Sequence, residues 1–352
     1  MVVDPILMEG VLAVIKIVIL LGLVFTTVAY LSYAERRVSA IIQDRLGPNR
    51  VGPMGLLQPL ADGIKFMWKE DFTPANADRT IFAIAPVIIL VPSLLIFAVI
   101  PAGGEITIPA FSFLGLQVPE TITRLQIIDL NVGILYILGM TSIGVYGIAL
   151  GGWSANNKFS LLGGIRASAQ MISYELSLGL SIVGILMLTG SLQMSNIVGA
   201  QDSITNWNIF RQPLAFLIFV VAAFAENNRL PFDLVECEQE LVGGYHTEYS
   251  SMSFSMFMIA EYASMTAASA MMATLFFGGW HMPFEDLFSP TLAVIYQTAG
   301  FIIKTAFFLF VYIWVRWSLP RFRYDQLMGI GWKVLLPLAL VNVVITGVWM
   351  LV

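Results

Sequence analysis

The chain has few charged residues, one cysteine and two histidines. Charged residues make up only 12% of its 352 residues, hydrophobic residues make up 58%, and the mean hydropathy is +0.82. These values exclude a soluble globular domain. Because Cys237 is the single cysteine, an internal disulfide bond is excluded. Two histidines leave few ligands for haem or a metal ion, so we expect no metal site.

Long apolar segments recur along the whole chain. A bilayer-spanning helix needs about 20 apolar residues, so the pattern predicts an all-α polytopic membrane protein with a single transmembrane domain over residues 1–352. The first run, Val11 to Leu31, is too long for a signal-peptide core and is expected to be retained. We expect eight helices, at about 10–32, 80–101, 129–151, 166–190, 213–228, 252–278, 296–317 and 333–352.

Basic residues are distributed unevenly between the loops. Fourteen of the 18 lysines and arginines fall in the odd-numbered loops, which the positive-inside rule places in the cytoplasm. Both termini are then expected on the periplasmic side. The predicted cytoplasmic loops are approximately 33–79, 152–165, 227–251 and 318–332.

Three carboxylates lie within or at the end of predicted spans. Glu175 and Glu261 fall near mid-membrane, and Glu226 closes the fifth span. A charged carboxylate at that depth costs several kcal/mol unless it is paired or hydrated, so these residues are expected to face the bundle interior and to handle protons or ions. The fourth span also has a polar stripe, which fits either a wet path or hydrogen bonding between helices: Gln170, Ser173, Ser177 and Ser181.

The fifth loop, AENNRLPFDLVECEQELVGGYHTEYSS, is rich in acids and has Arg229 as its local base. A solvated acidic surface is one interpretation. The other is a loop folded back into the protein, which its apolar residues favour. The acids after Glu226 are Asp233, Glu236, Glu238, Glu240 and Glu248, and the apolar residues are Leu230, Phe232, Leu234, Leu241 and Val242.

The first loop becomes amphipathic from Leu56 onward. Its polar and apolar residues separate onto two helical faces, which predicts an amphipathic helix at the cytoplasmic interface. The polar face is Gln58, Asp62, Lys65 and Lys69, and the apolar face is Leu57, Leu60, Ile64 and Trp68. A simple lipid anchor would also fit. However, opposite charges at the mouth of the bundle would suit a polar headgroup that enters from the membrane. The residues that would bring these charges there are Glu35, Arg36, Arg45 and Asp62.

Four stretches of the chain closely resemble one known family. They are ERRVSAIIQDRLGPNRVGPMGLLQPLADGIK, ISYELSLG, AENNRLPFDLVECEQELVGGYHTEYSSM followed by AEY, and RWSLPRFRYDQLMGIGWKVLLP. They are similar to the quinone-chamber membrane subunit (subunit 1) of proton-pumping NADH:quinone oxidoreductase, respiratory complex I. The chain departs from the usual family pattern at Asn227 and at Val235, where a proline or alanine is more common.

The resemblance implies two groups of site residues and no catalytic residue or cofactor on this chain alone. The quinone-chamber group is Glu35, Arg36, Arg45, Asp62, Lys65 and Tyr262. The proton-coupling group, which would link the chamber to antiporter-like subunits, is Glu175, Glu226, Arg229, Asp233, Glu236, Glu238, Glu240, Glu248 and Glu261. Arg316 and Arg321 match neighbouring family positions.

The resemblance also implies the chain's surroundings. Quinone would be the substrate, while NADH, FMN and iron–sulfur clusters would be bound by partner subunits. The implied partners are the hydrophilic subunits that carry the terminal cluster and the quinone-contacting arm, the small and antiporter-like membrane subunits, and lipid, with no nucleic acid. A bacterial plasma membrane is the expected location, and an organellar membrane is the alternative.

Other classes of protein share some of these features. A membrane subunit of an energy-converting hydrogenase is the nearest alternative, and an independent proton or ion transporter would also carry intramembrane acids. A cytochrome b-like protein would need paired histidines on its spans, whereas His246 and His281 fall in predicted loops on opposite sides. A passive anchor would not need the deep carboxylates.

Overall fold

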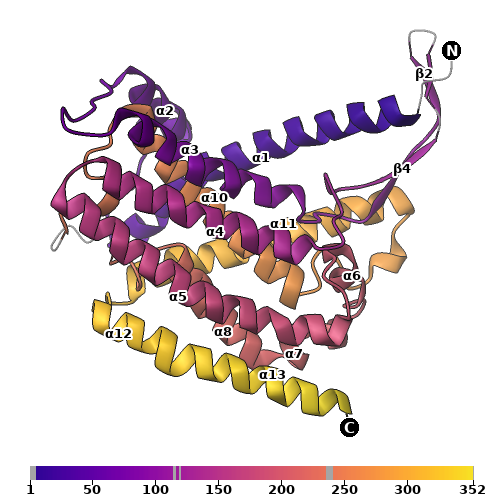
Figure 1. Cartoon of the computed structure of the whole chain (residues 1–352). Coiled ribbons are helices and arrows are strands. Elements are labelled where there is room, and N and C mark those ends of the chain that lie inside the picture. The colour runs from indigo at the N-terminus through magenta and orange to yellow at the C-terminus, as the bar shows by residue number, and fades with distance from the viewer. Residues whose placement is uncertain (1–4, 114–115, 119, 235–240, 352) are drawn as a thin grey trace.

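The computed structural model describes residues 5–113, 116–118, 120–234 and 241–351, and it confirms the all-α membrane fold (Figure 1). Each of the eight segments predicted as spans is helical. They are α1 (Pro5–Ile42), α3 (Arg79–Leu95), α4 (Gly133–Ser154), α5 (Lys158–Thr189), α8 (Pro213–Glu226), α10 (Ser251–Phe276), α11 (Pro290–Ser318) and α13 (Leu336–Leu351). Shorter helices are α2 (Gln58–Trp68), α6 (Met194–Gly199), α7 (Asn208–Arg211) and α12 (Tyr324–Gly329).

Six helical segments of the described chain are long and apolar enough to cross a membrane. They contain α1, α3, α4, α5, α11 and the continuous run of α12, a π-helical stretch over Ile330–Leu335, and α13. Helix α8 is apolar but has only 14 residues, about 21 Å at 1.5 Å per residue. Helix α10 has 26 residues and is more polar, and most of its second half is buried between its neighbours.

Helix α1 extends about ten residues beyond its predicted end at residue 32, because AERRVSAII contains no glycine or proline that would stop it. Glu35 and Arg36, which we predicted on the first loop, therefore lie on α1. The predicted loops 152–165 and 318–332 are also partly helical, because α5 begins at Lys158 and α12 at Tyr324.

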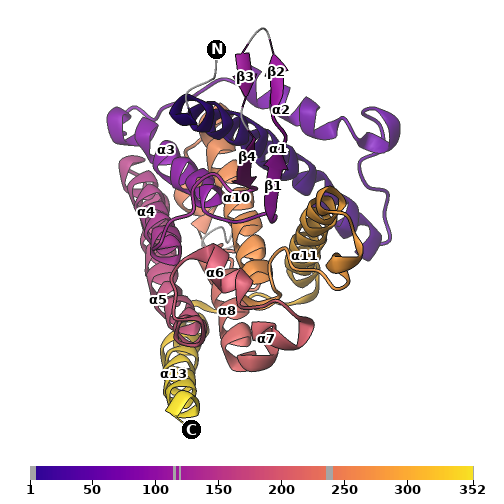
Figure 2. The same ribbon diagram turned by 90° about the vertical axis from the view of Figure 1, so that its right-hand side faces the viewer.

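The connection between α3 and α4 forms a β-hairpin that we did not predict. Its four strands are β1 (Glu105–Ile108), β2 (Phe111–Phe113), β3 (Leu116–Val118) and β4 (Thr121–Arg124). Strand β1 pairs with β4 and β2 pairs with β3, both antiparallel. Both views show the hairpin projecting beside the first turns of α1 (Figure 2). Lys16 on α1 joins them by donating to the Thr123 hydroxyl (2.6 Å) and to the Gln126 carbonyl (3.0 Å).

The helices form a bundle with two different ends. One end carries α2 and α12, and the other carries the hairpin, α6 and α7 (Figure 1). Inside the bundle, Tyr174, Phe219, Phe257, Phe276 and Tyr312 are among the largest fully buried side chains. Outside, α1, α11 and α13 expose many large apolar side chains, as expected for surfaces in contact with lipid or other apolar chains.

One glycine allows close packing beside the fifth loop. A Cβ at Gly163 on α5 would lie 2.7 Å from the Cα of Gly244, which belongs to the short helix η4 (Gly244–His246). We expect Gly163→Ala to destabilise the protein by about 1–3 kcal/mol, because the backbone of η4 must move. The measurement is the unfolding temperature in detergent or lipid. Gly179→Ala, on the same helix with nothing within 4 Å, is the control and should be neutral or slightly stabilising. Equal shifts for both variants would contradict the prediction.

Candidate functional site

A cluster of buried charges lies where α1, α10, α11 and the loop after α8 meet. Arg229 is at its centre: Nη1 lies 3.4 Å from Oε1 of Glu35, and Nε lies 2.6 Å from Oε1 of Glu261. The Tyr262 hydroxyl donates to Oε2 of Glu35 at 2.7 Å, and Arg316 forms a close ion pair with the same carboxylate. We call these five residues the charge cluster.

The chain after α8 places Arg229 there by local hydrogen bonds. The Arg229 amide donates to the Phe224 carbonyl at 3.2 Å, which turns the chain back at the end of the helix. Gln170 on α5 holds both sides of this turn, since its Nε2 donates to the carbonyls of Ala225 (2.8 Å) and Phe232 (2.9 Å). Gln170 belongs to the polar stripe predicted on the fourth span, and here it positions a loop.

Opposite charges balance each other within the cluster. Only 5–6% of Glu35 and Arg229 is exposed, so neither charge is solvated by bulk water. Burial alone would lower the pKa of the Arg229 guanidinium, but Glu261 and Glu35 raise it above its ordinary value. The Arg229 guanidinium also lies 4.5 Å from the centre of the Tyr262 ring, a cation–π distance. Arg229 is therefore a permanent cation that bridges two carboxylates from different helices.

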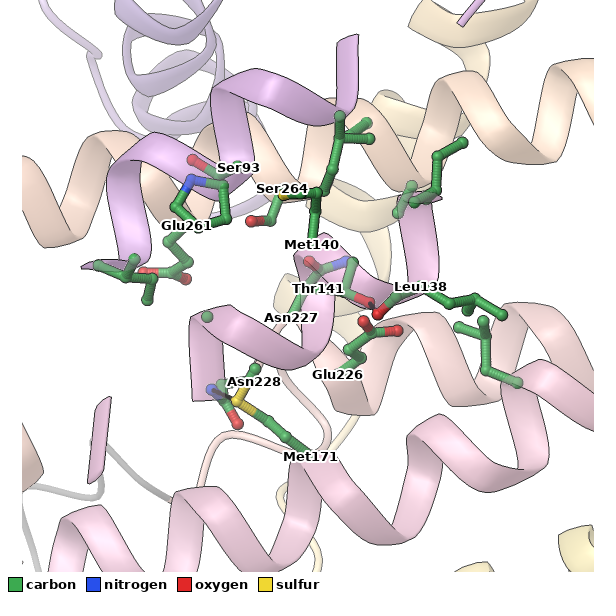
Figure 3. Close-up of a pocket in the computed structure, with 18 of the residues that line it drawn as sticks. Ser93, Leu138, Met140, Thr141, Met171, Glu226, Asn227, Asn228, Glu261 and Ser264 are labelled. Carbon is green, nitrogen blue, oxygen red and sulfur yellow. Dashed lines mark hydrogen bonds between the residues drawn. The ribbon is translucent and has the colours of Figure 1, made fainter. Parts of the chain in front are cut away.

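A cavity continues from Glu261 into the bundle. Apolar side chains line it together with polar ones that include Glu261, Glu226, Asn227, Asn228 and Thr141. Its volume, measured as the space open to the centre of a water molecule, is about 70 Å³. A buried water needs about 10–15 Å³ by this measure and two to four polar partners, so the cavity can hold several. In the view of Figure 3, Asn227 is drawn between Glu261 and Glu226. The cavity thus connects the charge cluster with an acid at the end of α8.

Glu226 and Glu175 form a second acidic site. They approach from α8 and α5 and are close enough to interact electrostatically. Two neighbouring hydroxyls of α4 lie beside them: Thr141 lines the cavity next to Glu226, and Ser142 donates a short hydrogen bond to Glu175. We predicted the two acids but not the hydroxyls. A polar Thr-Ser pair in the middle of an apolar helix was the signal that could have indicated them.

Asp62 on α2 forms a separate group with the end of α1. The Arg36 guanidinium donates to Asp62 at 2.7 Å, Gln58 donates to it at 2.9 Å, and Lys65 lies 3.6 Å away. The apolar side of α2 is exposed: Leu57, Leu60, Ile64, Met67 and Trp68 are 44–87% accessible. The amphipathic helix predicted from the sequence is therefore confirmed, and its apolar side is exposed on the surface of the bundle.

The described part of the acidic loop is folded back into the protein, as its apolar residues indicated. Phe232, Leu234 and Leu241 are 2–5% exposed, whereas Val242 is 58% exposed. Of the predicted acids, Asp233 pairs with Arg321 at 3.0 Å, and Glu248 accepts from Asn157 at 2.6 Å. Near Glu248, burial raises the pKa of Tyr249 to about 12, so this phenol stays protonated. Three predicted acids, Glu236, Glu238 and Glu240, lie outside the described residues.

The structure thus brings the predicted site residues together in part. Glu35, Arg229, Glu261 and Tyr262 share the charge cluster, and Glu175 and Glu226 share the second acidic site. Arg36, Asp62 and Lys65 form their own group. Arg45 stands apart in an exposed turn, where its Nε donates to Gln43 at 2.6 Å.

Comparisons with known proteins show the family to which this chain belongs. The family model described as NADH dehydrogenase matches residues 15–347. A curated relative from Geobacter metallireducens, named as an H-type subunit of NADH-quinone oxidoreductase, is 51% identical over 99% of this chain and 98% of its own length. One from Cytophaga hutchinsonii with the same name is 51% identical, covering 90% of each chain. One from Rhodothermus marinus, named NADH-quinone oxidoreductase subunit 8, is 49% identical over 93% of this chain and 94% of its own length. The chain therefore belongs to the NADH dehydrogenase family of membrane subunits, as its motifs indicated.

Proposed function

We propose that this chain, as a membrane subunit of a proton-translocating NADH:quinone oxidoreductase, forms part of the quinone chamber and carries protons from it. The observation that carries the proposal is the charge cluster, in which Glu35 and Arg229 are buried and Glu261 lines a cavity that Glu226 also lines. Its relatives are named for quinone oxidoreductase, which favours this function over a hydrogenase subunit or an independent transporter.

The quinone side of the proposal involves α1 and α2. The exposed apolar residues of α2 give a quinone tail an apolar route, while the Arg36–Asp62 pair offers charge to a polar headgroup. Glu35, on the same helix as Arg36, lies inward in the charge cluster. We assign Lys65 and Tyr262 to the same route, and Arg45 to its outer edge.

The proton side of the proposal runs through the acids. Reduction of a quinone consumes protons and changes the local charge. Glu35 and Glu261 would sense that change through Arg229, because all three charges are in contact. Waters in the cavity would connect Glu261 with Glu226 and then Glu175. Asp233, Glu236, Glu238, Glu240 and Glu248 are proposed to extend this path through the loop.

The surroundings follow from the same proposal. The end with α2 and α12 would face the bacterial cytoplasm, with both termini in the periplasm. Partner subunits would supply the terminal iron–sulfur cluster, FMN and the NADH site, and further membrane subunits and lipid would cover the apolar surfaces of α1, α11 and α13.

The test is inhibitor-sensitive NADH:quinone reductase activity of the whole complex with Glu35→Gln. We expect activity to fall at least about tenfold, which corresponds to about 1.4 kcal/mol, because Glu35 loses its charge opposite Arg229 and Arg316. NADH oxidation by an artificial acceptor that bypasses the quinone site should persist. Glu105→Gln, in an exposed ion pair with Arg124 on the hairpin, is the matched control and should leave activity unchanged. Full quinone reductase activity in an assembled Glu35→Gln complex would overturn the quinone-chamber role.

A further inference from the structure

Two neighbouring hydroxyls in the middle of α4 share one carbonyl oxygen, and each lies beside one acid. Ser142 donates to Glu175 and also lies 2.9 Å from the Leu138 carbonyl. Thr141 lies 2.9 Å from the Leu138 carbonyl and lines the cavity together with Glu226. Figure 3 shows Thr141 beside Glu226, at the wall of the cavity.

A hydroxyl has one proton to donate and two lone pairs that accept. It can therefore donate to a neighbouring carboxylate, or it can accept from the protonated carboxyl group while it donates to the Leu138 carbonyl. That carbonyl has two lone pairs, and the backbone N–H of Ser142 occupies one within the helix, so it can accept from one of the two hydroxyls at a time. Each acid thus keeps a hydrogen bond in either protonation state, and the change requires only rotation of an O–H bond.

The two acids also repel each other when both are charged. They interact electrostatically, and Glu226 lines a largely apolar cavity, where water screens poorly. A single proton shared between them lowers that repulsion. The site therefore has two states, with the proton on Glu226 or on Glu175, and in both states the acids have hydrogen-bonding partners.

We propose that Thr141 and Ser142 are positioning residues for proton transfer between Glu226 and Glu175, which rests on the proposed function of the acidic path. In the transfer, Glu226 gives up its carboxyl proton and becomes a carboxylate, and Glu175 gains a proton and becomes a carboxylic acid. The Thr141 hydroxyl turns from the Leu138 carbonyl to the Glu226 carboxylate, and the Ser142 hydroxyl turns the opposite way. The hydroxyls keep their own protons, and charge is conserved.

The experiment uses the complete complex in proteoliposomes with Thr141→Val and Ser142→Ala, singly and together. Two quantities are measured: the number of protons pumped per electron, and the infrared difference spectrum between the oxidised and the quinol-reduced enzyme. Because each substitution removes a hydrogen-bond donor beside a charged group, we expect about a tenfold change in the ratio of protonated Glu226 to protonated Glu175. The carboxylic-acid C=O bands should shift and pumping per electron should fall at least about twofold. Thr141→Ser keeps the hydroxyl and should restore both readouts.

The control is Ser181→Ala, which removes a buried hydroxyl of α5 that donates to the Leu178 carbonyl of its own helix. It should change neither the carboxyl bands nor pumping. Unchanged bands and pumping in the Thr141 and Ser142 variants would overturn the positioning role. If these variants fail to assemble, the carboxyl bands of Ser142→Thr decide, because altered hydroxyl geometry at Glu175 must shift them and a purely structural role would not.

Glu226→Gln and Glu175→Gln separate this proposal from the proposed function. If they abolish pumping while the hydroxyl variants do not affect it, the acidic path stands and the positioning role fails. If Glu226→Gln and Glu175→Gln pump normally, the acidic path itself fails, and the positioning role fails with it.

Discussion

Replacing Arg229 by methionine is expected to have the largest effect of any single substitution in the charge cluster. The change leaves the Glu35 and Glu261 carboxylates without the cation that lies between them. Removing one partner of a buried ion pair costs about 3–5 kcal/mol, because an uncompensated charge remains in a poorly solvated place. We expect loss of assembled complex and of quinone reductase activity, measured by native electrophoresis and by inhibitor-sensitive turnover.

Two comparisons decide whether charge is the cause. Arg229→Met with Glu261→Gln also removes the carboxylate closest to Arg229, while Glu35 keeps its ion pair with Arg316, and it should recover part of the assembly. Arg323→Met removes an arginine from an exposed pair with Asp325, with side chains 80% and 68% accessible, and should cost less than about 1 kcal/mol. A double variant that assembles no better than Arg229→Met, or an Arg229→Met complex that assembles and turns over normally, would contradict this explanation.

Replacing Lys304 by methionine is the second change for which we expect a large effect. The Lys304 ammonium donates to three carbonyls after the end of α10: Phe277 (2.8 Å), Gly279 (3.0 Å) and His281 (2.7 Å). It also lies 4.7 Å from the centre of the Trp207 ring. A cation at a helix C-terminus offsets the negative end of the helix dipole, and hydrogen bonds to a charged group are worth more than neutral ones.

Lys304→Met removes all of these interactions, so we expect a loss of about 3 kcal/mol in stability. Thermal unfolding of the complex and protease sensitivity near residues 277–289 measure it. Lys333→Met, at an exposed position on the last helical run, is the control and should leave both readouts unchanged. Because the contacts of Lys304 given above are with carbonyls after α10 and with Trp207, and not with the charge cluster, pumping per electron in surviving complexes should stay normal. Unchanged stability would contradict the capping role.

Hydrophobic periodicity was sufficient to predict the helices, because a bilayer allows few other structures. It was less informative about where helices end. Nothing in AERRVSAII distinguishes a helix that continues past the membrane from a loop, so Glu35 was predicted on the wrong element. The β-hairpin was missed because its short strands lie among turn residues and carry no long apolar run.

The acids of the site were predictable, but their partners were less so. A carboxylate at membrane depth is conspicuous in any sequence, which is why Glu175, Glu226 and Glu261 were identified. The Arg229 contacts join residues separated by up to 194 positions, and only the fold reveals which acids meet. Thr141 and Ser142 were overlooked because single hydroxyls in a span usually bond to their own helix.

The attachment of α1 restricts how its sequence can change. Lys16 contacts the hairpin and Glu35 belongs to the charge cluster, and these two positions are 19 residues apart, about 28 Å along the helix axis. Inserting or deleting one residue between Lys16 and Glu35 would rotate one side chain by about 100° around the helix relative to the other. Only one of the two sets of contacts could then form. Many side chains in this segment are exposed and apolar, and exchanging one for another disturbs neither end. The exposed positions of this segment can therefore vary, whereas its length and its buried residues Val24, Val28 and Leu31 are constrained.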